Sequence, residues 1–208
     1  MMKTLYIWIA ILMLISCDKE DVDSASENEQ SSFISAVDIS SFPEISNNNP
    51  SFYDSEGNEG DFLALMKTNG VNTIRLRLWN NPSDEHSGFG EVKAFSETLR
   101  SQGFNILLTL HYSDTWAVPA HQETPSQWEG LDFTTLKDSV YQFTKKIATE
   151  IPAEYIQIGN EINTGFLHPQ GHILSNFEQF RALMDTAIVA VRTHSNDTKI
   201  IMHHAGIE

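Results

Sequence analysis

The chain has 208 residues, of which 40% are hydrophobic, so it carries enough apolar side chain for one sizeable core. Its formal net charge of −15 at pH 7 repels nucleic acid phosphates and anionic membrane surfaces. No nucleic acid partner is therefore expected, and a neutral substrate suits the charge better.

The first 17 residues have the pattern of a lipoprotein signal peptide. An apolar run from Leu5 to Ile15 follows a single lysine and is too short to span a bilayer comfortably as a permanent helix. The run leads to Cys17, the only cysteine of the chain, so no intramolecular disulfide is possible. Leu14-Ile15-Ser16-Cys17 resembles a bacterial lipobox, which predicts a lipid anchor to the membrane at Cys17. The alternative is an ordinary signal peptide that ends in a cysteine.

Residues 18–32 are acidic and rich in serine, a composition typical of a solvated tether. An acidic stretch directly after a lipidated cysteine also resembles the surface-export signal of Bacteroidetes lipoproteins. We therefore expect an exported protein at the outer membrane or cell surface, with residues 33–208 forming the folded domain.

From residue 33 onward, short β-rich runs alternate with longer segments of helical periodicity. The predicted strands are residues 33–39, 71–79, 105–111, 155–159 and 199–203. Apolar residues at helical spacing between Phe133 and Ile147 predict one helix. A capping box of Ser175 and Glu178 predicts that another helix begins at Ser175. Strands that alternate with helices indicate parallel βα units.

No glycine-rich phosphate loop follows any of these strands. Gly70 and Gly103 precede strands instead, and we predict that they end helices as C-caps.

The strand ends carry polar and aromatic residues, and this chemistry decides between two fold classes. Five strands would complete a doubly wound sheet but not a (β/α)8 barrel. The residues at or just after the strand ends are Asp38, Arg75, Arg77, Trp79, His111, Tyr112, Asp114, Trp116, Asn160, Glu161, Asn163 and His203. Such groups at the ends of successive strands are typical of the catalytic face of a (β/α)8 TIM barrel, which is the fold class that we predict.

Arg75 and Arg77 lie two residues apart, so on a strand they share one face with Trp79. An edge strand that faces solvent would show the same alternation. A strand inside an α/β pattern is covered on both faces, however, and a buried guanidinium needs a carboxylate partner, so we expect a site role. Trp79 and Trp116 are core residues or, given the polar residues around them, platforms for the apolar faces of sugars.

The histidines do not predict a metal site. His203 and His204 are adjacent, so on a strand they point to opposite sides and cannot ligate one ion together. The chain has no His-x-His at a strand end and no helical His-x-x-x-His. We expect His111 and His203 to donate or accept hydrogen bonds around a carboxylate site.

Glu161 follows an apolar strand in the stretch "IQIGNEINTG", where it suits the role of a general acid. Cleavage of a glycosidic bond needs such an acid and, for a retaining mechanism, a second carboxylate about 5 to 5.5 Å away. Asn160 would then bond to the 2-hydroxyl of the sugar. The alternative is that Gly-Asn-Glu is only a turn at a strand end.

The stretches "DISSFPEI", "FYDSEGNEGDFLALMKTNGVNTIRLRLW", "HYSDTWAVPAHQETPSQW", "IQIGNEINTG" and "TKIIMHHAG" occur in this order. Together they resemble the N-terminal five βα units of family 53 of the glycoside hydrolases, the endo-β-1,4-galactanases. The resemblance implies a clan A (β/α)8 barrel that cleaves β-1,4-galactan side chains of pectin (arabinogalactan) with retention. It implies Glu161 as acid/base. The residues expected to contact the sugar are Asp38, Arg75, Arg77, Trp79, His111, Asp114, Trp116, Asn160, Asn163 and His203.

The sequence departs from the family pattern in three ways. Thr109 stands where the family usually has Asp, and Val118 replaces the Asp of Trp-Ala-Asp-Pro. The family's nucleophile, a Glu at the end of the seventh strand, has no match, and Glu208 does not correspond to it. We therefore expect a fragment or truncated open reading frame of about five βα units, inactive as it stands. No cofactor is expected in this segment, since the family's occasional calcium site belongs to the other half.

A function from another class stays open on the sequence. Surface lipoproteins include non-catalytic glycan-binding proteins, and a partial barrel with aromatic platforms could bind sugar without cleaving it.

Overall fold

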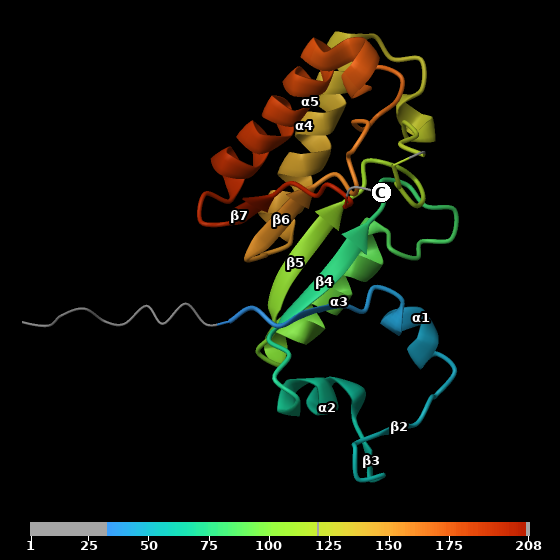
Figure 1. Ribbon diagram of the computed structural model, residues 1–208, viewed down its shortest axis with the longest axis vertical. Coiled ribbons are helices and arrows are strands. Elements are labelled where there is room, and N and C mark those ends of the chain that lie inside the picture. Colours follow the sequence, from blue (N-terminus) through green and yellow to red (C-terminus); the bar gives the residue numbers. More distant parts are fainter. Residues whose placement is uncertain (1–32, 120, 207–208) are drawn as a thin grey trace, which may run out of the picture. The chain divides into compact units, whose positions relative to one another are not determined.

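Five parallel strands form the main sheet of the computed structural model, which describes residues 33–119 and 121–206 (Figure 1). In spatial order they are β1 (Ala36–Asp38), β4 (Thr73–Leu78), β5 (Asn105–Leu110), β6 (Tyr155–Ile158) and β7 (Lys199–Ile201). Each strand pairs in parallel with the next one. The five predicted strands are confirmed, although each is shorter than predicted.

Several predictions fall on residues that the structure does not describe. The signal peptide with Cys17, the tether of residues 18–32 and Glu208 lie outside the described residues. Within the described ranges, no helix has both the length and the apolar character needed to cross a bilayer.

Helices separate the strands, as the alternating pattern predicts. They are α1 (Phe42–Ser46), α2 (Phe62–Thr68), α3 (Phe89–Ser101), α4 (Phe133–Glu150) and α5 (Ile173–His194), with a 3-10 turn at Ser126–Trp128. A small antiparallel hairpin, β2 (Phe52–Tyr53) and β3 (Glu59–Gly60), precedes α2 and was not predicted. The helix expected over Phe133 to Ile147 is confirmed as α4.

The helix ends show why these segments start and stop where they do. The Asp61 side chain accepts a bond from the amide of Ala64 at the start of α2, which satisfies a free donor of the first turn. Gly70 after α2 and Gly103 after α3 have φ of +86° and +81°, a left-handed conformation that suits glycine. Gly70 and Gly103 thus end the two helices as predicted, although the C-caps themselves are the preceding residues Asn69 and Gln102.

The predicted start of α5 is wrong. The helix begins at Ile173, its N-cap is His172 without a side-chain capping bond, and the Ser175–Glu178 capping box does not form. The amide of Asn176 already bonds to the carbonyl of His172, which makes a helical turn before Ser175. The Asn176 side chain then donates to the carbonyl of Pro169 at 2.8 Å, and Asn176 leaves the helical region with φ of −140°. Two helical segments thus meet at a kink at Asn176, where the capping box was expected.

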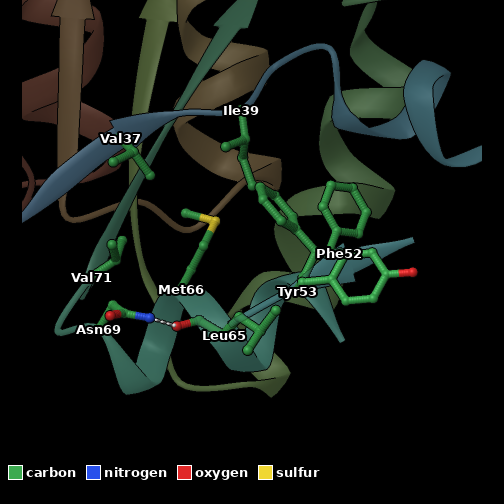
Figure 2. A pocket seen from close by; sticks show the side chains of 9 residues that line it. Val37, Ile39, Phe52, Tyr53, Leu65, Met66, Asn69 and Val71 are labelled. Carbon is green, nitrogen blue, oxygen red and sulfur yellow. Dashed lines mark hydrogen bonds between the residues drawn. The ribbon is translucent and has the colours of Figure 1, made fainter. Parts of the chain in front are cut away.

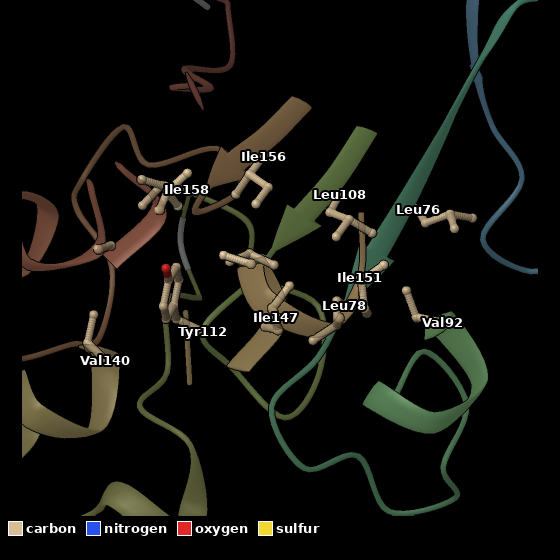
Figure 3. Close-up of a cluster of buried hydrophobic side chains, with 14 of the residues drawn as sticks. Leu76, Leu78, Val92, Leu108, Tyr112, Val140, Ile147, Ile151, Ile156 and Ile158 are labelled. Atoms are coloured by element: carbon tan, nitrogen blue, oxygen red, sulfur yellow. The ribbon is translucent and has the colours of Figure 1, made fainter. Parts of the chain in front are cut away.

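The two faces of the sheet differ in chemistry. One face carries a row of fully buried aliphatic residues that pack against α3, α4 and α5, and Figure 3 shows part of this cluster. Its members from the strands include Ile74, Leu76, Leu78, Ile106, Leu108, Leu110, Ile156 and Ile158. The alternate residues of the same strands point to the other face, where Arg77, Thr109 and Gln157 lie side by side in register. This second face leads to the candidate site.

Candidate active site

The polar face of the sheet ends in a network that joins three strands. Arg75 on β4 pairs with Asp38 on β1 through Nη1 and donates from Nη2 to Asn160 Oδ1 at 2.8 Å. Arg75 therefore has the carboxylate partner that the sequence predicted. Burial alone raises the pKa of Asp38, but hydrogen bonds from Ser40 and the Arg75 guanidinium outweigh it, so the net pKa lies below the usual value. Asp38 is ionised at neutral pH.

Asn160 collects hydrogen bonds from several elements. Its Oδ1 accepts from Arg75 and from Gln157 Nε2 at 3.3 Å, and its Nδ2 donates to the carbonyl of Ala117 at 2.8 Å. His203 Nδ1 lies 3.1 Å from the same Oδ1. The side chain is 4% exposed, so the residue next to Glu161 is locked in place.

Glu161 has an unusual backbone for a residue with a side chain. Its φ is +49°, and it follows a turn at Gly159 with φ of +75°. A left-handed residue other than glycine is strained and persists when its surroundings hold it, often at functional sites. No hydrogen bond joins the Glu161 carboxylate to any residue in the described part of the chain. The predicted acid therefore presents a half-buried carboxylate without a protein partner.

His111 is a neutral hydrogen-bond donor. Its Nδ1 accepts from Trp79 Nε1 at 3.3 Å and from the amide of Ala117 at 3.2 Å, so the ring proton sits on Nε2. Burial, with the charges of Arg75 and Arg77, lowers the pKa of His111 to about 3. Nε2 is buried and has no hydrogen-bond partner among residues 33–119 and 121–206. The predicted hydrogen-bonding role of His111 fits this geometry.

His203 is also predominantly neutral at pH 7. Burial and the charge of Arg75 lower its pKa, although Glu161 acts in the opposite direction. Its Nδ1 lies 3.3 Å from the amide nitrogen of Glu161 and its backbone carbonyl accepts from the amide of Ile162. The structure thus places His203 beside Glu161, as expected, and the role of Glu161 as an acid stays a prediction.

The carboxylate partner expected for Arg77 is absent among the residues described. Its Nε donates to Ser87 Oγ at 2.8 Å, and Nη2 lies 2.7 Å from His86 Nε2. His86 Nδ1 lies 2.9 Å from Glu91, a close contact without good hydrogen-bond alignment. The guanidinium also stacks near two indole rings, with its carbon 4.9 Å from the Trp79 ring centre and 4.4 Å from that of Trp116. A serine hydroxyl, the His86 imidazole and two indole rings thus surround the Arg77 guanidinium in place of a carboxylate.

The two tryptophans have different exposure. Trp116 is 50% exposed, whereas Trp79 is 9% exposed and lies edge-on to it at 5.9 Å between ring centres. Trp116 can therefore present a ring face to a sugar, while the buried Trp79 packs against the ring of Trp116. A direct sugar contact by either ring stays a prediction.

Asp114 and Asn163 are tied up in bracing loops. Asp114 accepts from the amide of Asn81 at 3.0 Å and from both the amide and the hydroxyl of Ser126. Asn163 exchanges two bonds with the backbone of Ala205 at 2.9 and 3.2 Å. In the structure both side chains hold loops together, and their contacts with a sugar stay a prediction.

Sequence reasoning missed two glutamines beneath the site. Gln157 is the one polar residue of the short apolar strand β6, and that break in the pattern was a usable signal. Gln122 lies in the loop after β5, bonds to the backbone around Glu161, and had no signal in the sequence. Among the described residues, no group of three His, Cys, Asp or Glu side chains is arranged to hold a metal ion.

An apolar hollow of about 410 Å³ lies apart from this network. Figure 2 shows it between β1, the β2–β3 hairpin and α2, with Val37, Ile39, Met66 and Tyr53 among the lining residues. None of the predicted site residues lines it. We therefore do not assign it to the active site.

Comparisons with known proteins point in one direction. The sequence profile of glycosyl hydrolase family 53 matches residues 34–208. A probable arabinogalactan endo-β-1,4-galactanase A of Aspergillus terreus is 42% identical over 113 residues, covering 52% of this chain and 32% of the relative. An endo-β-1,4-galactanase of Bacillus subtilis is 28% identical over 195 residues, covering 88% of this chain and 44% of the relative.

A solved structure shares the fold. The family 53 catalytic domain of Ignisphaera aggregans superposes with a TM-score of 0.78 at 38% identity, covering 84% of this chain and 52% of that one. The predicted fold class is confirmed: the strands and helices are successive βα units of the barrel type. The chain spans about half, or less, of the length of these relatives.

The strain at Glu161 is testable through stability. We expect Glu161→Gly to raise the free energy of unfolding by about 0.5 to 1 kcal/mol relative to Glu161→Ala, because glycine adopts a positive φ without a steric penalty. Alanine is the matched control, since it also removes the carboxylate but keeps the strain. Urea unfolding measures both variants, and equal stabilities would contradict the assignment of strain.

The ion pair of Asp38 predicts a pH dependence. A carboxyl whose pKa is lowered by folding stabilises the protein above its unfolded pKa of about 3.9, and this contribution is lost as the pH falls through the lower folded value. The difference in unfolding free energy between the native chain and Asp38→Asn should therefore be largest above about pH 5 and shrink below about pH 4. Urea unfolding across this range tests it, and a difference that does not change with pH would refute it.

Proposed function

The chain belongs to glycosyl hydrolase family 53, and from that premise we propose that it forms the acid/base side of an endo-acting, retaining β-1,4-galactan hydrolase. The observation that carries the proposal is the placement of Glu161. Its carboxylate stands without a protein partner at the end of β6, while Asn160, Arg75 and Asp38 are bonded to one another beside it. The names of the galactanase relatives support galactan or arabinogalactan as the substrate.

The chemistry assigns one role to each group. Glu161 protonates the leaving glycosidic oxygen as the C1–O bond breaks, and later takes a proton from the water that attacks C1. The exposed ring of Trp116 offers an apolar face to a pyranose. The buried, neutral His111 holds Trp79 next to that ring by accepting a hydrogen bond from its indole N–H. Asn160 remains the candidate for the 2-hydroxyl.

A second carboxylate must attack C1 from the opposite side, about 5 to 5.5 Å from the acid. Asp38 is paired with Arg75, and Asp114 is held by Asn81 and Ser126, so neither is free for this role. We therefore propose that the nucleophile lies outside the described residues. We therefore expect the described residues alone not to hydrolyse galactan.

Glycan binding without catalysis is the second candidate function. The half-exposed Trp116 next to a buried cation favours it, because such a ring binds sugar whether or not a nucleophile is present.

Binding and turnover measured on the purified chain test this proposal. We expect calorimetry to show binding of β-1,4-galactotetraose with a preference over cellotetraose, and an assay of reducing ends to show no release from galactan. Glu161→Gln should leave the binding nearly unchanged, because an amide keeps the shape of the carboxyl. Equal binding of the two tetrasaccharides would count against galactan specificity.

Turnover would change the proposal in a defined way. If the chain releases reducing ends and Glu161→Gln removes at least 100-fold of that rate, as expected for loss of a general acid, a carboxylate within these residues or from a second copy completes the site. In a protein that supplies the nucleophile, the same substitution should slow galactan hydrolysis by at least about 100-fold, and less for a substrate with a very good leaving group.

We also propose that Cys17 anchors the protein to the outer membrane or cell surface through lipid, with residues 18–32 as tether. The support is the sequence pattern of residues 1–17. Several acyl chains are needed for stable anchoring, and a bacterial lipoprotein carries them. Cys17→Ala should release the protein from the membrane fraction or block its processing. Membrane-bound, processed Cys17→Ala protein would exclude the anchor.

A further inference from the structure

Gln122 lies in the loop between β5 and α4 and is 2% exposed. Its Nε2 is 2.8 Å from the carbonyl oxygen of Asn160 and 3.2 Å from those of Glu161 and Val118. Because carbonyl oxygens only accept, these contacts fix which end of the amide faces Glu161. We propose that Gln122 is a positioning residue that holds the backbone of Glu161 and thereby aims its carboxylate. This inference rests on the acid/base role proposed for Glu161.

The peptide groups on either side of Glu161 are held from two directions. Gln122 donates to the carbonyls of Asn160 and Glu161. From the other direction, the amide of Ile162 donates to the His203 carbonyl at 3.0 Å, and the amide of Glu161 lies 3.3 Å from His203 Nδ1. A peptide group is rigid, so fixing both of them fixes φ and ψ of Glu161 and the direction of its Cα–Cβ bond.

The conformation at Glu161 makes such support necessary. A φ of +49° is unfavourable for glutamate, so the residue would relax toward negative φ if its flanking peptide groups were free to turn. That rotation would swing the carboxylate away from its place at the end of β6. Gln122 opposes it by holding the two carbonyls.

Gln122 itself has a fixed base. The amide of His168 donates to the Gln122 carbonyl at 2.8 Å, and Thr124 Oγ1 donates to the His168 carbonyl at 2.9 Å. Two hydrogen bonds therefore join the loop that carries Gln122 to the loop that follows Glu161, and they fix the backbone of Gln122.

The amide is a poor choice for stability alone. Gln122 Oε1 is buried and has no hydrogen-bond partner within the described ranges. A buried acceptor without a partner destabilises the fold, so an apolar side chain of similar shape would suit simple packing better. The hydrogen bonds donated by Nε2 are what this position gains from glutamine.

Gln122→Met tests the proposal, with Gln170→Met as the matched control. Gln170 Nε2 also bonds a loop carbonyl, that of Leu131 at 3.0 Å, but does not contact Glu161. We expect Gln122→Met to speed amide hydrogen exchange of Glu161 and Ile162 by about tenfold or more, the factor for loss of one well-formed hydrogen bond. Exchange in β4 and β5 should stay unchanged. Gln170→Met should leave Glu161 and Ile162 protected.

The relative affinity for a cationic and a neutral sugar measures whether the Glu161 carboxylate is correctly placed. The chain should bind 1-deoxygalactonojirimycin, a cationic galactose analogue, in preference to neutral galactose, because a carboxylate attracts the ammonium. Gln122→Met should lower this preference about tenfold and Glu161→Gln should abolish it, while Gln170→Met should not change it. If the unmodified chain binds neither sugar, the proposed function fails, and the exchange measurement still decides the role of Gln122.

Gln122→Glu gives an independent check that survives poor folding of the methionine variant. Its carboxyl can donate to the carbonyls only when protonated, so protection of Glu161 should be weak at neutral pH and recover on acidification, relative to Gln170→Met at each pH. Unchanged exchange at Glu161 in both Gln122 variants, or equal loosening by Gln170→Met, would overturn the proposal.

Discussion

The guanidinium of Arg75 is the constraint on which the site depends. A partly buried charge on the polar face of the sheet needs an opposite charge and hydrogen-bond partners. Asp38 on the neighbouring strand supplies the charge, and Asn160 beyond β6 supplies an acceptor two strands away. The same Asn160 oxygen lies beside His203, which follows β7. The cation on β4 is thus linked to groups on β1 and just after β6 and β7, and Glu161 is the residue next to that acceptor.

Arg77 shows a different solution on the same strand face. Its planar, weakly hydrated guanidinium can stack on aromatic rings, and it lies near both Trp79 and Trp116. The hydroxyls of Ser87 and Ser41 accept hydrogen bonds from Nε and Nη2 of this guanidinium. The cation therefore stiffens the exposed indole of Trp116 from behind. Arg75 organises the groups next to Glu161, and Arg77 supports the exposed ring of Trp116.

What the sequence could predict depended on local chemistry. The pairing of Arg75 with a carboxylate followed from burial of a charge inside an α/β pattern, and the left-handed cap at Gly70 followed from glycine before a strand. The bracing role of Asp114 could not be predicted, because its partners Asn81 and Ser126 belong to two separate loops. Likewise, Gln122 looks like any loop glutamine until the loop after β6 is placed against it. Loop-to-loop hydrogen bonds depend on tertiary arrangement, which the strand and helix pattern does not encode.

The features that lower the stability of this fold are concentrated toward the carboxyl ends of the strands. Among the residues described, the buried side-chain polar atoms without a hydrogen-bond partner belong to His86, Thr109, His111, Gln122 and His172. All of them lie toward the carboxyl ends of the strands or in the loops that follow, and none lies among the aliphatic residues beneath the helices. The strained φ of Glu161 is found at the same end. Unpaired donors and acceptors and backbone strain lower stability wherever they occur, and features of this kind tend to collect at functional sites rather than in packed cores.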